Sequence, residues 1–502
     1  MTMANPIADH LKRLYRLSLL DISQRRVAVL LCSDPLKYVH LATVENELGE
    51  TIIEARDIVF KGLVDNLGIP QTMREPLVKI MTPIFLQTFK WLEFHEEYLK
   101  TSSSRFKYRE YLKHFRWTHM GTINYRKTAE SVIRDEKLPI DLRFMFACLY
   151  CLEEDIQDLW QKLSTRRQDE FLNKDPSKYK HQREIVVLWT CILKGRVDKL
   201  DQLLKKVGRR YYTTIYQYAF EWFAVKAYET ATRYFFEKLT RAEKRASLVR
   251  TATAVAKRDG NFVQAYNDVS CFLLSHMNAE QLKKVLAAVP YGILRIFMEW
   301  PRQDAFVEVA TLLLPYLQEE NYKMMNFVLS RKFKLVYNSL KLFKDIFLVS
   351  PRNFRHSTYY LPEFFNNKDT DTIQFMFRNM DPGETLELFL NPITLYGIFE
   401  LVNEEEWHFL EFFIRESRLS RAGVKRFAME FDTNFESLLD RETRERFGRM
   451  VDDICTVISN QNFSNGNEVN RMNPMGFQPS AQPEKARGQA EEARPAKKNK
   501  NT

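Results

Sequence analysis

The apolar positions of residues 141–207 form one pattern that occurs twice in succession. In the first copy, apolar residues recur over 142–152 and, after a polar break, restart at Ile156. The second copy spans 185–193 and restarts at Val197 after another polar break. Apolar residues spaced three or four positions apart share one face of an α-helix. Each copy therefore predicts two short helices joined by a polar turn.

Similar restarts recur along much of the remaining chain, at intervals of 31 to 44 residues. Self-similarity at such a period is typical of helical repeat proteins, in which stacked units bury a shared core. The pattern predicts an α-solenoid of stacked helical hairpins over residues 121–460. The first apolar residues after successive breaks are Ile156, Val197, Tyr228, Phe262, Phe306, Leu340, Ile373 and Trp407.

The two ends of the chain differ from this array. Residues 461–502 are rich in Asn, Gln, Gly, Pro, Ser and charged residues, which predicts a disordered C-terminal tail because little apolar surface is available for burial. Residues 1–120 have longer amphipathic segments without the repeat, and we expect them to form an N-terminal helical domain that ends near Gly121. Its expected helices lie within 7–31, 38–67, 76–100 and 105–119.

The composition agrees with an all-α chain, because only 15 Gly and 18 Pro occur among 502 residues and alternating β-branched runs are missing. The longest apolar run, 144–152, is too short to span a bilayer, and charged residues occupy the N-terminal stretch where a signal peptide would be apolar. The six cysteines lie mostly in apolar helical segments, as buried thiols of a reducing compartment do. We expect a cytoplasmic protein without a membrane span, with the nucleus as the alternative location.

The second copy also carries a family resemblance. Leu188, Trp189 and Cys191 precede a glycine turn at Gly195, and a double leucine follows at 203–204. This arrangement resembles the helical half of an ankyrin repeat, although the Thr-Pro-Leu-His signature of that family is absent. The whole chain loosely resembles uncharacterised helical-repeat families of arthropods. The resemblance implies a degenerate ankyrin-like solenoid and no particular activity.

No catalytic or metal-binding motif is complete in the sequence. Cys148 and Cys151 have the CxxC spacing, but a zinc site would need a second ligand pair, so we interpret both as core residues. His95 begins a zincin-like motif in which Leu99 occupies the place of the second histidine. Phosphate-binding and nucleophile motifs are missing as well. The sequence therefore predicts a protein that is not an enzyme, with no cofactor and no small-molecule substrate.

The polar breaks of the two clearest copies carry opposite charges. Glu153, Glu154 and Asp155 make the first break acidic, whereas Lys194 and Arg196 make the second one basic. In a solenoid such turns align along one edge, where their charges would select a protein partner by electrostatic complementarity. The alternative is that these turns are merely solvated. Our preferred hypothesis is a protein–protein interaction scaffold that binds through these five residues.

Nucleic-acid binding is the alternative function. A net charge of +10 permits it, and the segment 105–119 interleaves cations with aromatic residues, as a surface that binds single strands requires. The other interpretation of this segment is an amphipathic helix whose aromatic residues pack inward. Its cations are Arg105, Lys107, Arg109, Lys113 and Arg116.

Overall fold

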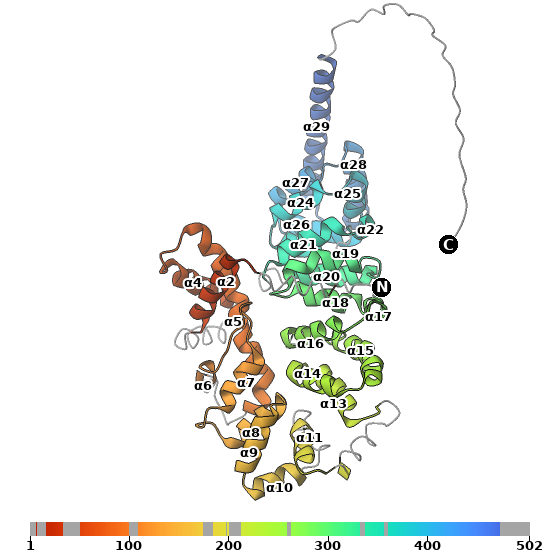
Figure 1. Ribbon diagram of the computed structural model, residues 1–502. Coiled ribbons are helices and arrows are strands. Elements are labelled where there is room, and N and C mark those ends of the chain that lie inside the picture. The colour runs from red at the N-terminus through yellow and green to blue at the C-terminus, as the bar shows by residue number, and fades with distance from the viewer. Residues whose placement is uncertain are drawn as a thin grey trace, which may run out of the picture. The chain divides into compact units, whose positions relative to one another are not determined.

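The computed structural model describes Ile7 and residues 17–33, 51–99, 109–173, 184–196, 198–199, 212–258, 263–331, 337–355 and 360–471. This part of the chain is all-α, which confirms the predicted class (Figure 1). Its extended pairing is limited to one antiparallel bridge between Trp117 and Ile123. The chain divides into two compact units, Met1–Arg418 (unit 1) and Leu419–Thr502 (unit 2).

Unit 1 begins with a group of helices whose longest member is α5 (Gln71–Leu99, 29 residues). This helix contacts α2 (Leu19–Cys32), α4 (Thr51–Asp65) and α8 (Ile140–Leu149). Gly68, at φ 64°, lies in the predicted break before α5. The helix starts at Gln71, earlier than expected, and contains Pro76 and Pro83. Pro76 is exposed, whereas Leu77 beside it is buried in the unit. These helices are α2 (Leu19–Cys32), α4 (Thr51–Asp65), α5 (Gln71–Leu99), α6 (Arg109–Leu112) and α7 (Tyr125–Ile133).

The domain boundary that the sequence predicts near Gly121 does not separate compact units, because both sides of it belong to unit 1. Gly121 has a φ of 79°, and a Cβ atom there would lie 3.1 Å from Trp300 and 3.2 Å from Ile84. Arg25 of α2 donates a hydrogen bond to the carbonyl of Met120 and lies over the Trp300 ring. The N-terminal helices are therefore packed against the later helices of the same unit.

The rest of unit 1 consists of short helices that follow one another as pairs with additional helices between some of them (Figure 1). The pairs are α8 (Ile140–Leu149) with α9 (Glu153–Lys162), α13 (Ile215–Val225) with α14 (Glu229–Lys238), α15 (Arg241–Ala256) with α16 (Val263–Ser275), α18 (Pro290–Met298) with α19 (Phe306–Leu313), α20 (Glu319–Arg331) with α21 (Ser339–Val349), α23 (Leu361–Asn366) with α24 (Thr370–Arg378), and α26 (Pro392–Asn403) with α27 (Trp407–Glu416). The additional elements are α10 (Thr165–Asn173), α11 (Glu184–Leu193), α17 (Ala279–Ala288), η3 (Gln303–Ala305), α22 (Arg352–Arg355) and α25 (Pro382–Phe389).

Within the described ranges, one turn geometry recurs at the ends of five helices. After each helix, one residue adopts the left-handed conformation, and the next amide donates a hydrogen bond of 2.9–3.0 Å to the carbonyl five residues earlier. This is the Schellman arrangement, which satisfies carbonyls that a helix end leaves free. Only one of the five turns uses glycine, so the others accept the strain of a side chain at positive φ. The left-handed residues are Cys151, Gly195, Ala227, Lys368 and Glu405.

These turns define the register of the paired helices. The residue five positions after the left-handed one is fully buried wherever it is described, at Ile156, Thr232, Ile373 and Leu410. The sequence analysis predicts the first apolar residue after each polar break, and this position agrees with the register at Ile156 and Ile373. The predicted positions Tyr228 and Trp407 lie four and three residues too early. Val197 and Phe262 lie outside the described residues.

Corresponding helices of consecutive pairs contact one another through much of unit 1. Along the first helices of the pairs, α13 contacts α15, α18 contacts α20, and α23 contacts both α20 and α26. Along the second helices, α14 contacts α16, α19 contacts α21, and α24 contacts both α21 and α27. The sequence predicts repeat units of two helices each, whereas the structure has additional helices between some of the pairs. For example, α17 contacts both α15 and α18 and thus lies between two pairs.

Unit 2 contains a helical hairpin of α28 (Arg421–Phe435) and α29 (Arg441–Arg471). Phe431 and Phe447 join the two helices, with their ring centroids 4.5 Å apart. Because α29 continues to Arg471, it extends beyond position 461, where the sequence predicts that the tail begins. The rest of that predicted tail, 472–502, lies outside the described residues.

No helix in the described part of the chain is by itself long and apolar enough to cross a membrane. Only α25 and α26 taken together reach that length and hydropathy, and they are bent by 66° with respect to each other.

Candidate functional site

A cavity of about 470 Å³ lies within unit 1, between its N-terminal helices and the starts of α7, α14 and α16. Five aromatic side chains line it, and they come from four separate parts of the chain. The ring of Phe94 on α5 lies 5.0 Å from Tyr228 and 5.9 Å from Tyr125. We call it the aromatic cavity, after Phe94, Trp117, Tyr125, Tyr150 and Tyr228.

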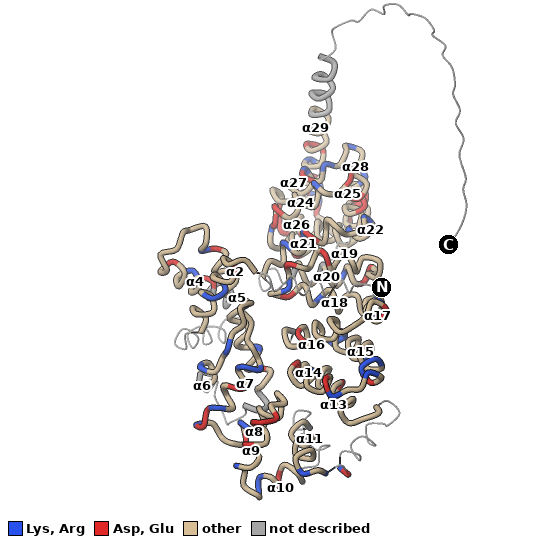
Figure 2. The backbone as a smooth tube through the Cα atoms, in the orientation of Figure 1, with Lys and Arg blue, Asp and Glu red and all other residues tan. Residues whose placement is uncertain are grey.

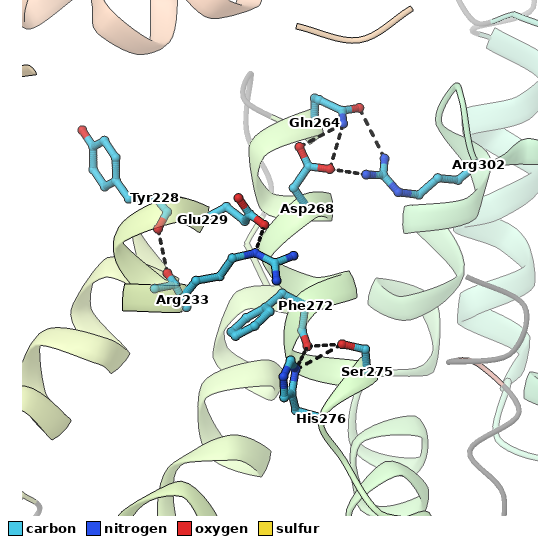
Figure 3. Close-up of polar contacts among 10 residues, drawn as sticks. Tyr228, Glu229, Arg233, Gln264, Asp268, Phe272, Ser275, His276 and Arg302 are labelled. Carbon is cyan, nitrogen blue, oxygen red and sulfur yellow. Dashed lines mark hydrogen bonds and ion pairs between the residues drawn. The ribbon is translucent and has the colours of Figure 1, made fainter. Parts of the chain in front are cut away.

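Two carboxylates also line the aromatic cavity, Glu229 at the start of α14 and Asp268 on α16 (Figure 3). Burial raises the pKa of Glu229, and the negative charge of Asp268 raises it further, although Arg233 opposes the shift. Each carboxylate has an arginine partner, Arg233 for Glu229 and Arg302 for Asp268. The cavity therefore brings two negative charges close together and retains each with one internal cation.

The arginine partners are held by further contacts. Arg302 is only 6% exposed and also donates a hydrogen bond to Gln264, whose amide donates to Asp268 over 3.0 Å. The guanidinium of Arg233 lies 4.4 Å from the ring centroid of Phe272 (Figure 3). Both arginines are thus held in place, because moving either would break contacts with groups other than the carboxylates. Arg302 lines the aromatic cavity itself, whereas Arg233 does not.

A buried histidine supports one wall of this cavity. His95 is completely buried, and its Nδ1 lies 2.7 Å from the carbonyl oxygen of Trp91, which can only accept. Nδ1 therefore carries the proton, and Nε2 accepts a hydrogen bond from the Tyr150 hydroxyl over 2.7 Å. This pair fixes the position of the Tyr150 ring at the cavity.

A second hollow of about 760 Å³ adjoins the aromatic cavity and shares five lining residues with it, Asn124, Arg126, Tyr150, Glu229 and Thr230. We call it the acidic groove, because six carboxylates and three arginines line it on a chain whose net charge is +10. Its carboxylates are Glu130, Glu153, Glu154, Asp155, Glu229 and Glu237, and its arginines are Arg126, Arg134 and Arg233.

The acidic residues singled out from the sequence all line this groove, but they do not form a turn. Glu153, Glu154 and Asp155 are the first three residues of α9, and the turn precedes them. Leu152 offers no side-chain cap there, so the three negative charges compensate the positive end of the helix dipole. Burial raises the pKa of Asp155, while Arg134 opposes the shift.

The basic residues of the second predicted turn have different surroundings. Lys194 lies 3.3 Å from the Gln168 amide oxygen and over the Trp160 ring, and Arg196 pairs with Asp198 at 2.7 Å. Neither residue lines the acidic groove. The structure thus does not bring the acidic and basic sets together in one hollow, and their joint role in partner binding stays a prediction.

The basic aromatic segment 105–119 is not one continuous helix. Its described part contains the four-residue α6, with Arg109 at its start, and then the bridge at Trp117. Lys113 pairs with Asp135 at 2.6 Å, and Arg116 donates a hydrogen bond to Ser131 over 3.0 Å.

Two of the aromatic residues in the described part of this segment are unavailable for base stacking. Tyr111 and Phe115 are buried, and Phe115 packs against Trp91. This arrangement favours the interpretation in which the aromatic residues pack inward. Figure 2 shows positively and negatively charged residues interspersed along the described helices. Arg105 and Lys107 lie outside the described residues.

The thiols and carboxylates of the described residues form no cluster that could hold a metal ion. All six cysteines are buried and free, and burial raises the pKa of both Cys148 and Cys151. Nowhere in the described ranges do three His, Cys, Asp or Glu side chains gather as a metal ion would require. What the arrangement offers chemically is a concave surface with aromatic walls and clustered negative charge.

No protein-family model matches the chain, and a comparison with curated proteins finds no significant match. The resemblance to ankyrin repeats therefore stays a prediction.

Sequence reasoning missed Glu229, Asp268 and Arg302, three of the charged residues that line the aromatic cavity. Glu229 belongs to α14 and Asp268 to α16, whereas Arg302 directly precedes η3, and no local motif connects them. The only signal was indirect, because Tyr228 was identified as the start of a repeat unit.

Proposed function

We propose that the protein is a non-enzymatic interaction scaffold, in which stacked helix pairs form an α-solenoid and the acidic groove binds a protein partner. The recurring Schellman turn and the contacts between corresponding helices support the solenoid. In such arrays each unit packs on its neighbours, and an extended surface remains available for binding.

The observation that carries the binding proposal is the acidic lining of a concave surface on a basic chain. Charged residues of one sign in a cleft raise the local concentration of oppositely charged partners and speed their association. The groove therefore favours a partner with a basic surface or segment. This explanation assigns a role to Glu153, Glu154 and Asp155, and it does not require Lys194 or Arg196.

A charge reversal at Glu154 tests this proposal. Glu154 is exposed and is the second residue of α9, so Glu154→Lys should leave the core intact while placing a positive charge in the groove. We expect the affinity for a partner captured from native extract to fall by about five- to tenfold at low salt, on the order of 1 kcal/mol. Titrating immobilised protein with the purified partner measures this change.

Glu280→Lys is the matched control, because Glu280 is also exposed and is the second residue of its helix, α17, outside the groove. Equal affinities of the two variants would show that the partner binds elsewhere on the chain.

A further inference from the structure

The aromatic cavity has the chemical features of a site for an organic cation. Lysine ammonium and arginine guanidinium groups are attracted to the faces of aromatic rings, most strongly where water is excluded. Phe94, Tyr150 and Tyr228 are each at most 6% exposed, and Trp117 and Tyr125 are half-buried. A cation that entered this space would thus meet several aromatic groups in a poorly solvated environment.

The two carboxylates of the cavity, Glu229 and Asp268, also attract positive charge. Arg233 Nε contacts one oxygen of Glu229, Oε1, and Arg302 contacts Oδ1 of Asp268. The amide of Gln264 donates to both oxygens of Asp268, over 3.0 Å and 3.1 Å. Because each carboxylate oxygen has two lone pairs, Oδ2 of Asp268 and the carboxylate of Glu229 retain acceptor positions for a further donor. An additional cation between Glu229 and Asp268 would relieve their mutual repulsion.

Of the other cations that line the cavity, Arg126 contributes positive charge at Glu229, but Arg126 and Lys127 are both exposed. Arg126 pairs with Glu130 at 3.1 Å, and its side chain is 62% exposed. Lys127 is exposed at the surface of α7, and Arg302 is already engaged by Asp268 and Gln264. The aromatic cavity also opens beside the acidic groove, whose excess of carboxylates adds to the attraction for positive charge.

We propose that the aromatic cavity receives a lysine or arginine side chain of the partner, while neighbouring basic residues of the same segment lie along the acidic groove. This inference rests on the proposed function and names the class of partner, an extended basic protein segment. Five residues line both hollows, so the path between them is continuous, and the exposed side chain of Arg126 lies at this junction. The shared residues are Asn124, Arg126, Tyr150, Glu229 and Thr230. A free amine could occupy the cavity alone, whereas a basic segment would also reach the groove, in which six carboxylates outnumber three arginines.

Isothermal titration of the full chain with a short peptide of alternating lysine and alanine tests the inference. The same peptide with every lysine acetylated is the uncharged control. We expect the lysine peptide to bind and acetylation to weaken binding by tenfold or more. Equal binding of both peptides would overturn the proposal, because it would show that positive charge is not recognised.

Two variants test whether the lysine peptide binds in the aromatic cavity. Glu229→Gln keeps the shape of the side chain and removes its charge, and Trp117→Leu removes one aromatic wall without touching the carboxylates. Each should weaken binding of the lysine peptide by about tenfold. Glu280→Gln, outside both hollows, should leave binding unchanged. Circular dichroism verifies that each variant is folded.

The outcomes separate this inference from the proposed function. If Glu154→Lys abolishes peptide binding while Glu229→Gln and Trp117→Leu bind normally, the groove is the binding surface and the cavity proposal is wrong. If all three bind normally, the segment contacts neither hollow, and both proposals are overturned.

Discussion

Replacing Phe413 with alanine should destabilise unit 1 by about 3–5 kcal/mol, which is the usual effect of truncating a fully buried phenylalanine. Phe413 on α27 is completely buried. Its ring centroid lies 4.8 Å from Phe365 on α23, 5.2 Å from Phe377 on α24 and 4.8 Å from Phe389 on α25. One side chain thus joins two consecutive helix pairs and the helix between them.

Urea denaturation followed by far-UV circular dichroism measures this loss. Tyr396→Ala in the neighbouring α26 is the control, because Tyr396 is 57% exposed and its truncation removes little buried surface. We expect the control to change stability by less than about 1 kcal/mol. Similar midpoints for the two variants would contradict the packing of these helix pairs.

Acidification should destabilise the protein through His95. Burial lowers the pKa of His95 to about 3, against an ordinary value of 6.5. Because the folded pKa is the lower one, the unfolded chain binds the proton more readily. The contribution is fully present above pH 6.5 and is lost as the pH falls from 6.5 towards 3. Its slope is about 1.4 kcal/mol per pH unit, or about 2 kcal/mol between pH 7 and pH 5.

Comparing wild type with His95→Phe at pH 7 and pH 5 isolates this effect from other titrating groups. Phenylalanine keeps the aromatic packing on Trp91 and Phe146 but has no proton to bind. The variant should be less stable at pH 7, because the Tyr150 hydroxyl loses its acceptor, yet its stability should decline less on acidification. His408→Phe, at an exposed position, should keep the wild-type slope. Equal slopes for wild type and His95→Phe would contradict a buried neutral His95.

The sequence was sufficient to predict an all-α chain and the turn at Gly195, because the apolar period and a glycine at positive φ are local signals. The turns at Cys151 and Ala227 have the same geometry without glycine. They are buried, so tertiary packing sets their conformation, and no local signal marks them. The helix start at Glu153 was misassigned because acidic residues are typical both of polar turns and of the first turn of a helix.

The acidic groove could be predicted only in part, since Glu153, Glu154 and Asp155 are adjacent in sequence and conspicuous. Glu237 belongs to a different helix, and the aromatic cavity combines α5, α7, α14 and α16. Composition and periodicity cannot bring such residues together, because the contacts depend on how the N-terminal helices fold back onto later ones. Arg25 and Gly121, which mediate that contact, carry no repeat signal.

Hydrogen exchange of the full chain, with and without the captured partner, tests the proposed binding surface most directly. Amides of α9 and α14, whose first turns line the acidic groove, should exchange more slowly in the complex, whereas those of α17 should be unchanged. Protection confined to helices outside the acidic groove and the aromatic cavity would contradict a partner site there.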